Sequence, residues 1–402
     1  MRRLASLVVL TLAAVGVHAE PPAELARSAD LAETSALAEL GLIAPKSAPL
    51  RFQIDDSTAL TVMGVMRGYY RNDQRIEWSG VEDSFGAEGI LRTRFERERK
   101  PWVFAAEAEL YLSLPNGRSI LSDADRDLYR ENFIVPPLQV FQLFAELRHG
   151  DWNVRLGRFR TPLGRNDSPI LTNSFLDAPF LRTEVIGFTE TGLLASWRPG
   201  VFSLQVGLTN GETELDTNSS KAVIGRLGAG QERWAVGMWV KAHDGISSEQ
   251  QKRFNSFAGF DARLKFKRFS IYAEGVIDQH GLYRDLNAEG NPLALGPRSL
   301  YGRDIFVAPR RAIWGGGFDV GVLFRGDKFV VDVNYGLYFP EAIGNAAHDE
   351  LIHRGVVKLL YAVGPRVQIF GAGLVENKRP HEVPFFDRAP PFAILGGLQI
   401  GF

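Results

Sequence analysis

The stretch Ala258-Gly-Phe-Asp-Ala-Arg-Leu-Lys-Phe-Lys267 decides the fold, because two kinds of side chain alternate along it without a break. Ala, Phe and Leu occupy the even-numbered positions, whereas Gly, Asp, Arg and Lys occupy the odd-numbered ones. Successive side chains of a β-strand point to opposite faces, so a period of two is the pattern of a strand. The stretch therefore predicts a strand with one dry face and one wet face.

The same alternation recurs along the chain, at residues 60–69, 102–112, 202–208, 234–240, 269–277, 314–324, 329–339 and 392–402. A Lys or Arg on the lipid-facing midplane of a membrane barrel costs roughly 2–4 kcal/mol, so the charged face of such strands must look inward. We therefore expect a wet pore wall that includes Arg92, Arg94, Glu107, Glu109, Arg155, Arg263 and Lys265.

The connections between these segments alternate between long and short. Short turns are expected at residues 100–101, 149–151, 198–200, 229–232, 267–268, 325–327 and 364–365, and eight longer connections lie between them and beyond. Short periplasmic turns and long external loops are typical of outer-membrane barrels with an even number of strands. The sequence thus predicts an all-β fold, a transmembrane antiparallel up-and-down barrel of about 16 strands over residues 52–402.

The N-terminus predicts export. Arg2 and Arg3 precede an apolar run that ends in Val17-His18-Ala19, so we expect a signal peptide over residues 1–19. This run is shorter than the roughly 20 apolar residues that a membrane-spanning helix needs. Together with the strands, it predicts a bacterial outer-membrane location. Cleavage removes two of the 46 basic residues, leaving 44 against 47 acidic ones, a net charge of −3 that implies no nucleic-acid partner.

A short helix is expected between the signal peptide and the barrel. Leu25, Leu31, Leu37 and Leu40 are interspersed with Ala, Glu and Asp, which indicates an amphipathic helix within residues 20–51. Two interpretations of this segment remain open, a periplasmic extension and a plug in the lumen.

Aromatic residues lie near the predicted short turns and at the end of the final strand. Trp102, Trp152, Trp197 and Trp234 lie beside short turns, which predicts an aromatic girdle at the periplasmic interface. The final strand ends in Phe402. A terminal Phe on such a strand resembles the assembly signal of outer-membrane proteins, which implies the barrel assembly machinery as a partner.

One segment carries a family resemblance. Phe144, Glu146, Trp152 and Arg155 are followed by Gly-Arg-Phe-Arg-Thr-Pro-Leu-Gly at residues 157–164, and this pattern resembles the phosphate-selective porin O and P family. The wider likeness covers roughly residues 52–402. The resemblance implies a trimeric sixteen-strand channel in which basic residues attract anions. The chain departs from a purely basic pattern, because acidic residues follow the motif.

The third long connection, residues 158–188, is the candidate constriction of the pore. Backbone is tolerated inside a barrel because it meets water and protein rather than lipid, so this segment can fold inward. An external loop that contacts lipopolysaccharide or a neighbouring subunit is the alternative. The charged candidates in it are Arg158, Arg160, Arg165, Asp167, Asp177, Arg182 and Glu184, with one more basic than acidic group.

These features predict a passive diffusion channel for small polar solutes, with a weak lean to anions such as phosphate. No enzymatic activity, cofactor or metal is expected, because the chain has no Cys and His348 and His353 lack the helical spacing of a zinc site. A non-conducting structural or adhesive barrel and a hydrolase with its site at the barrel rim remain as alternatives. The expected partners are outer-membrane lipid, small solutes and two further copies of the chain.

Overall fold

The structure of the protein, a computed structural model, describes residues 50–73, 83–114, 138–164, 181, 189–211, 221–231, 233–246, 252–283, 313–340, 352–364, 366–376 and 392–401. The predicted signal peptide, nearly all of the predicted N-terminal helix and most of the third long connection lie outside these residues. Within them, no helix is long and apolar enough to cross a membrane.

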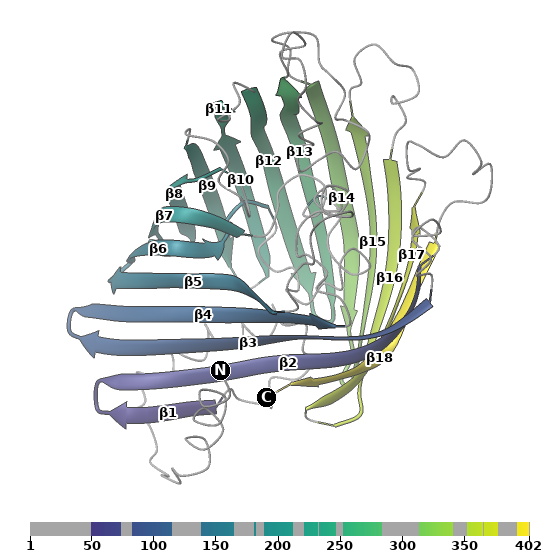
Figure 1. Cartoon of the computed structure of the whole chain (residues 1–402), viewed down its shortest axis with the longest axis horizontal. Coiled ribbons are helices and arrows are strands. Elements are labelled where there is room, and N and C mark those ends of the chain that lie inside the picture. The colour runs from purple at the N-terminus through teal and green to yellow at the C-terminus, as the bar shows by residue number, and fades with distance from the viewer. Residues whose placement is uncertain are drawn as a thin grey trace, which may run out of the picture.

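The described residues form eighteen strands, because segments of alternating sequence recur between residues 50 and 401 (Figure 1). In chain order they are β1 (Leu50–Asp55), β2 (Thr58–Asp73), β3 (Asp83–Arg99), β4 (Trp102–Leu114), β5 (Leu138–His149), β6 (Trp152–Arg160), β7 (Thr189–Trp197), β8 (Phe202–Thr209), β9 (Ala222–Gln231), β10 (Trp234–Ala242), β11 (Asp244–Ile246), β12 (Lys252–Phe266), β13 (Phe269–Tyr283), β14 (Ile313–Arg325), β15 (Phe329–Pro340), β16 (Ile352–Ala362), β17 (Val367–Glu376) and β18 (Phe392–Gly401).

Sixteen of these strands, β2 to β10 and β12 to β18, form the barrel wall. Each pairs antiparallel with the next along the chain. The last strand, β18, pairs with β2 and closes the ring, from Ala393 opposite Asp73 to Gly401 opposite Val65. The predicted sixteen-strand antiparallel barrel is confirmed. Closure leaves no unpaired strand edge in lipid, where an unsatisfied backbone group costs several kcal/mol.

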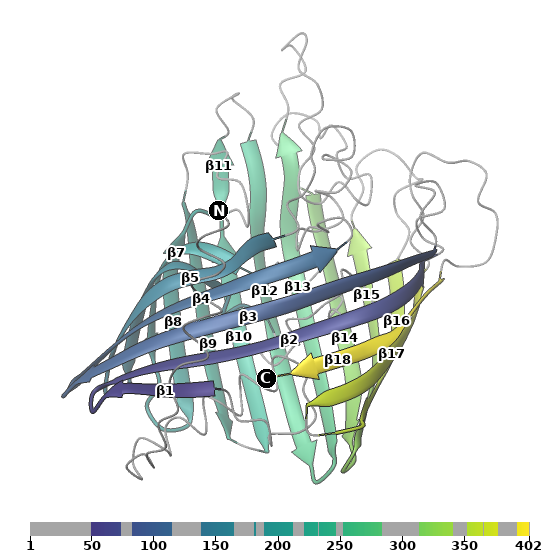
Figure 2. The same cartoon turned by 60° about the horizontal axis from the view of Figure 1, so that its bottom comes forward.

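The two remaining strands extend this wall. β11 is a short outer continuation of the β10 to β12 hairpin and pairs with the start of β12. β1 pairs with the first half of β2, from Leu50 opposite Val62 to Asp55 opposite Thr58, on the edge that β18 occupies further along. The two ends of the described chain therefore share one strand position, and Figure 2 shows β1 in line with the arrow of β18.

Two strand boundaries differ from the sequence prediction. The predicted alternation begins at residue 60, so no strand is predicted at β1, although Leu50, Phe52 and Ile54 already alternate with polar residues. β2 and β3 also extend to Asp73 and back to Asp83, which makes the first long connection shorter than expected. The six residues of β1 follow a proline-containing linker and are too short a segment to predict a strand. In the structure, pairing with β2 stabilises them as a strand.

The outer wall is apolar, as the alternation predicts. Its most exposed side chains include Leu156 and Met238, each with 64% of the surface accessible, and Ile277 with 62%. On the final strand, Ile394 and Leu398 are likewise more than half exposed. Such a surface is stable in contact with hydrocarbon, so the barrel is built to span a membrane.

An aromatic belt surrounds the end of the barrel that carries the short turns. Trp102, Trp152 and Trp197 are exposed there, and the last two stack with ring centroids 5.7 Å apart. Trp234 is half-buried at the same end. The belt continues on β13 to β15, where the ring of Phe324 contacts the rings of both Phe269 and Phe329. Amphipathic and aromatic rings favour the headgroup level, so the predicted Trp girdle has its place at one membrane interface.

Candidate functional site

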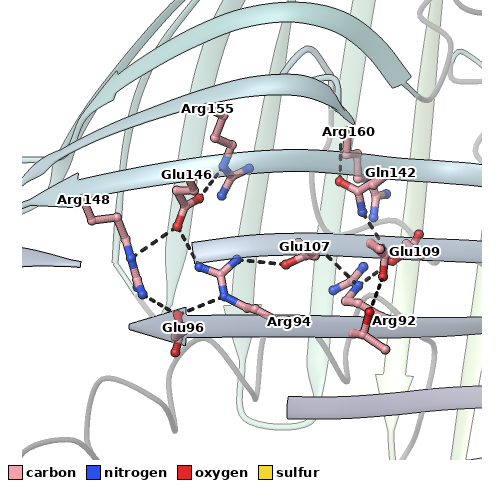
Figure 3. Close-up of polar contacts among 12 residues, drawn as sticks. Arg92, Arg94, Glu96, Glu107, Glu109, Gln142, Glu146, Arg148, Arg155 and Arg160 are labelled. Carbon is pink, nitrogen blue, oxygen red and sulfur yellow. Dashed lines mark hydrogen bonds and ion pairs between the residues drawn. The ribbon is translucent and has the colours of Figure 1, made fainter. Parts of the chain in front are cut away.

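The inner wall of β3 to β6 carries a continuous ion-pair network, drawn in Figure 3. Arg94 lies at its centre and contacts three carboxylates on three strands. Its Nε donates to Glu96 at 2.9 Å, its Nη1 to Glu107 at 2.9 Å and its Nη2 to Glu146 at 2.7 Å. Alternation places all these side chains on one face, and the cross-strand register sets Arg94 directly opposite Glu107.

Glu146 joins this centre to the next strand. Its side chain is 1% exposed and accepts from Arg155 Nε at 2.6 Å, and Arg148 Nε lies 3.2 Å from it. Arg148 also pairs with Glu96. One carboxylate on β5 thus receives three guanidinium groups, which is a favourable way to hold a charge away from water.

The network continues toward the long connections through Arg92, which pairs with Glu109 and lies 3.7 Å from Glu107. Gln142 Nε2 donates to Glu109 at 3.3 Å, and the Gln142 side-chain oxygen accepts from the backbone N–H of Arg160 at 2.9 Å. The predicted wall residues on β3, β4 and β6 are therefore brought together. Arg160, predicted for the constriction, meets the same cluster at the end of β6.

Leaving Arg160 aside, the charges joined by the salt bridges of this cluster balance. Its salt bridges join four arginines to four glutamates, Arg92, Arg94, Arg148 and Arg155 to Glu96, Glu107, Glu109 and Glu146. A balanced set produces little net field in the lumen. The basic wall residues predicted on β3 and β6 therefore contribute less to ion selectivity than their number indicates.

Arg158 contacts the barrel wall at a β-bulge in β5. The register of β4 and β5 shifts after Glu109, so Phe141 is an extra residue on β5. Arg158 Nε donates to the carbonyl oxygen of Phe141 at 3.1 Å. A bulge re-aims the groups beside it, and alternation alone does not reveal one. This contact is therefore beyond the sequence prediction.

The inner wall of β13 to β15 has a different chemistry. Asp278 and Asp332 accept hydrogen bonds from tyrosines, Tyr338 at 2.8 Å and Tyr272 at 3.0 Å respectively. Arg263 and Lys265 occupy inward positions on the neighbouring β12, between outward Phe260, Leu264 and Phe266, as the alternation predicts. Their strand, β12, is separated from β6 by four other strands of the ring.

The third long connection enters the barrel. Residues 161–164, which follow β6, are buried, and Leu163 and Leu181 have no exposed surface. Both leucines belong to an apolar cluster with inward side chains from strands around much of the barrel, Phe144, Phe159, Leu194, Ile224, Trp239, Phe257, Val276 and Tyr338. A Cβ on Gly317 of β14 would lie 3.1 Å from Leu181 Cδ2, so the connection reaches a wall far from β6 and β7.

Several predicted site residues fall outside the described part of the chain. These are Arg165, Asp167, Asp177, Arg182 and Glu184 of the third connection and the terminal Phe402. One ion pair, in contrast, is not anticipated by the sequence. Glu190 on β7 and Lys241 on β10 pair at 2.6 Å, with 1% of each side chain exposed. Alternation along β7 places Glu190 inward with Leu194, but it does not reveal a partner three strands away.

A closed antiparallel ring, apolar outside and ion-paired inside, with a chain segment folded into it, defines a membrane-spanning β-barrel of the porin class. No model of a known protein family matches the sequence, and no curated protein matches it either. Solved structures of bacterial outer-membrane proteins do match.

The outer membrane channel DcaP of Acinetobacter baumannii matches with a TM-score of 0.58 and 12% identity, over 87% of this chain and 99% of its own. OmpT of Vibrio cholerae has a TM-score of 0.58 and 10% identity over 88% and 100%. An anion-selective porin from Comamonas acidovorans has a TM-score of 0.56 and 13% identity over 86% and 100%. The chain has the fold of bacterial outer-membrane porins, which agrees with its predicted location.

Proposed function

We propose that the protein is a passive diffusion channel for small polar solutes in the bacterial outer membrane. The observation that carries this proposal is the pairing of an apolar outer wall with an inner wall of charged side chains in a closed ring of sixteen strands. A barrel of this size can enclose an aqueous passage, whereas smaller barrels are filled by their own side chains.

The third connection supplies the constriction in this proposal. Its described residues lie against the inner wall, which supports a narrowing formed by Arg158, Arg160, Arg165, Asp167, Asp177, Arg182 and Glu184. We assign a weak anion preference, for solutes such as phosphate, to the single basic excess of this set. The paired charges on β3 to β6 produce little net field in the lumen. Ion selectivity then depends mainly on the charges at the narrowest point, which supports this assignment.

Reversal potentials in a planar bilayer with a salt gradient test the proposal. We expect the purified wild-type barrel to conduct with a weak preference for anions, and the combined replacement of Arg158, Arg160 and Arg165 by Ala to shift selectivity toward cations. A wild-type channel that prefers cations, or a triple variant with unchanged selectivity, would remove the third connection from the selectivity mechanism. Absence of conduction would reject the channel itself.

One observation favours a second candidate, a barrel that is closed at rest. Several inward charged side chains have at most 1% of their surface exposed, among them Glu109, Asp319 and Arg354. Other protein atoms therefore cover parts of the inner wall. Single-channel recording separates the two functions, because a closed barrel gives no steady current. The expectation that the protein is not an enzyme stays a prediction.

Assembly is also proposed rather than observed. We infer a homotrimer, and one of the similar solved structures is a trimer form of OmpT from Vibrio cholerae. Cross-linking in native membranes tests this state, and monomers alone would contradict it. Recognition of Phe402 by the barrel assembly machinery, removal of residues 1–19 and contacts with lipopolysaccharide belong to the same proposal.

A further inference from the structure

The third connection is held where it leaves β6 by one arginine of the inner wall, on a strand three positions further around the barrel. Arg226 on β9 donates from Nη1 to two backbone carbonyl oxygens of the connection, Gly164 at 2.9 Å and Pro162 at 3.3 Å. These residues are more than sixty positions apart in the sequence. Backbone carbonyls turned away from water need such donors, so the contact satisfies groups that would otherwise be buried unpaired.

A carboxylate fixes the orientation of this guanidinium group. Asp261 on β12 accepts from Arg226 Nη1 at 2.6 Å and from Nη2 at 2.8 Å, which is the bidentate geometry of a strong arginine–carboxylate pair. Both side chains are about nine-tenths buried. With the fork held by Asp261, Nη1 remains directed at the connection.

The strand between the two partners carries a glycine where the guanidinium group of Arg226 crosses it. Arg226 and Asp261 lie on β9 and β12, and β10 runs between them with Gly237 directly opposite Asp261. A Cβ at residue 237 would lie 2.4 Å from Arg226 Nη2 and 3.0 Å from Asp261 Oδ2. Because residue 237 has no side chain, the guanidinium group of Arg226 has room to cross β10 and reach Asp261.

The other end of the connection has its own fixed point. Glu190, the second residue of β7, pairs with Lys241 on β10, and Lys241 Nζ lies 5.6 Å from the ring centroid of Phe257. Between the two ends, Leu163 and Leu181 are fully buried in the apolar cluster. The inner wall therefore holds residues 162–164 through Arg226, and the start of β7 through the pair of Glu190 with Lys241.

We propose that Arg226, oriented by Asp261 and admitted by Gly237, is the positioning residue of the third connection. It holds residues 162–164 against the inner wall and so sets the cross-section of the passage. This inference rests on the proposed channel function for its consequence, but the positioning itself can be measured without any current.

Cysteine labelling measures the position directly. The chain contains no Cys, so a Leu163→Cys variant carries a single reporter at a site that is fully buried. We expect a membrane-impermeant maleimide to label it slowly in the otherwise wild-type barrel. Adding Arg226→Ala should accelerate labelling by about tenfold or more, because local opening exposes the reporter. Gly237→Ala should act in the same direction by displacing the guanidinium while retaining it.

The matched control is Arg268→Ala, which removes an arginine paired with Asp327 at 2.9 Å in a short-turn region outside the lumen. It should leave the labelling rate unchanged. Heat-modifiable migration verifies that each variant is folded. Equal labelling rates in folded Arg226→Ala and parent barrels would overturn the proposal. If Arg226→Ala does not fold, Gly237→Ala becomes the deciding variant. Equal rates in folded Gly237→Ala and parent barrels would then overturn the proposal.

Conductance then links position to passage. We expect Arg226→Ala to change the mean single-channel conductance and to increase its fluctuation. Arg226→Lys keeps the positive charge but lacks the planar guanidinium group. We expect this variant to change the conductance and its fluctuation in the same way, with little change in ion selectivity. A wild-type barrel that does not conduct would reject the proposed function and leave the labelling result standing. Accelerated labelling with unchanged conductance in both variants would reject the control of cross-section by Arg226.

Discussion

At the scale of single residues, inward aromatic rings lie against glycines of neighbouring strands. The ring of Tyr272 on β13 covers Gly321 on β14, and a Cβ there would lie 2.1 Å from the tyrosine Cζ and hydroxyl oxygen. Tyr338 covers Gly315 and Gly317 in the same way. Gly315, Gly317 and Gly321 of β14 thus let these rings lie against the wall.

Replacing such a glycine should destabilise the barrel. We expect Gly321→Ala to displace Tyr272, break its hydrogen bond to Asp332 and lower the free energy of unfolding by about 1–3 kcal/mol, the usual result of overpacking. Urea unfolding in lipid vesicles measures the change. Gly355→Ala is the matched control on β16, since nothing lies within 4 Å of its added Cβ. Equal destabilisation by both substitutions would refute the role of the ring.

The carboxylate of Glu146 makes a second prediction at this scale. Glu146→Gln removes one negative charge from a cluster in which Arg94, Arg148 and Arg155 all contact it. We expect the reversal potential to shift toward anion selectivity, because the cluster then carries an excess positive charge. Arg155→Gln should shift it in the opposite direction. Shifts of the same sign in the two variants would show that charge in this cluster does not control selectivity.

At the scale of elements, the strands could be predicted from the sequence and the contacts between distant elements could not. Alternation with a period of two gives both a strand and its two faces, so the strands that carry Glu107, Glu109, Arg263 and Lys265 could be predicted. A hydrogen bond from Arg226 to Gly164 joins residues that no local pattern relates. The partners of an inward charge depend on the register and curvature of strands that are far apart in the sequence.

The short strand β1 offers a test at this scale. Residues 58–62 of β2 have β1 as their partner on the seam side, so deleting residues 50–57 should leave backbone groups unpaired. Each lost hydrogen bond costs about 1 kcal/mol. We expect a clearly lower temperature for the heat-modifiable transition on gels. Deletion of residues 20–49, which retains β1, is the control for stability. An equal transition temperature in both deletions would mean that β1 does not stabilise the seam.

At the scale of the whole molecule, the inner surface differs from one side to the other. The β3 to β6 side pairs arginines with glutamates, whereas Asp278 on β13 and Asp332 on β15 receive hydrogen bonds from tyrosines. Composition gives 46 basic against 47 acidic residues and cannot reveal this separation. A solute that passes between the two sides meets different hydrogen-bonding groups on each.

The shared strand position of β1 and β18 has a consequence for how the molecule is made. Gly401 lies opposite Val65 and Leu50 opposite Val62, so the two ends are three positions apart along β2, about 10 Å. A circular permutant that joins these ends through a short peptide and opens a long connection elsewhere should preserve the ring. In the natural order, the first and last strands must meet, so a nascent polypeptide still in transit cannot close. Completion of the barrel has to wait until translation and export of the final strand have finished.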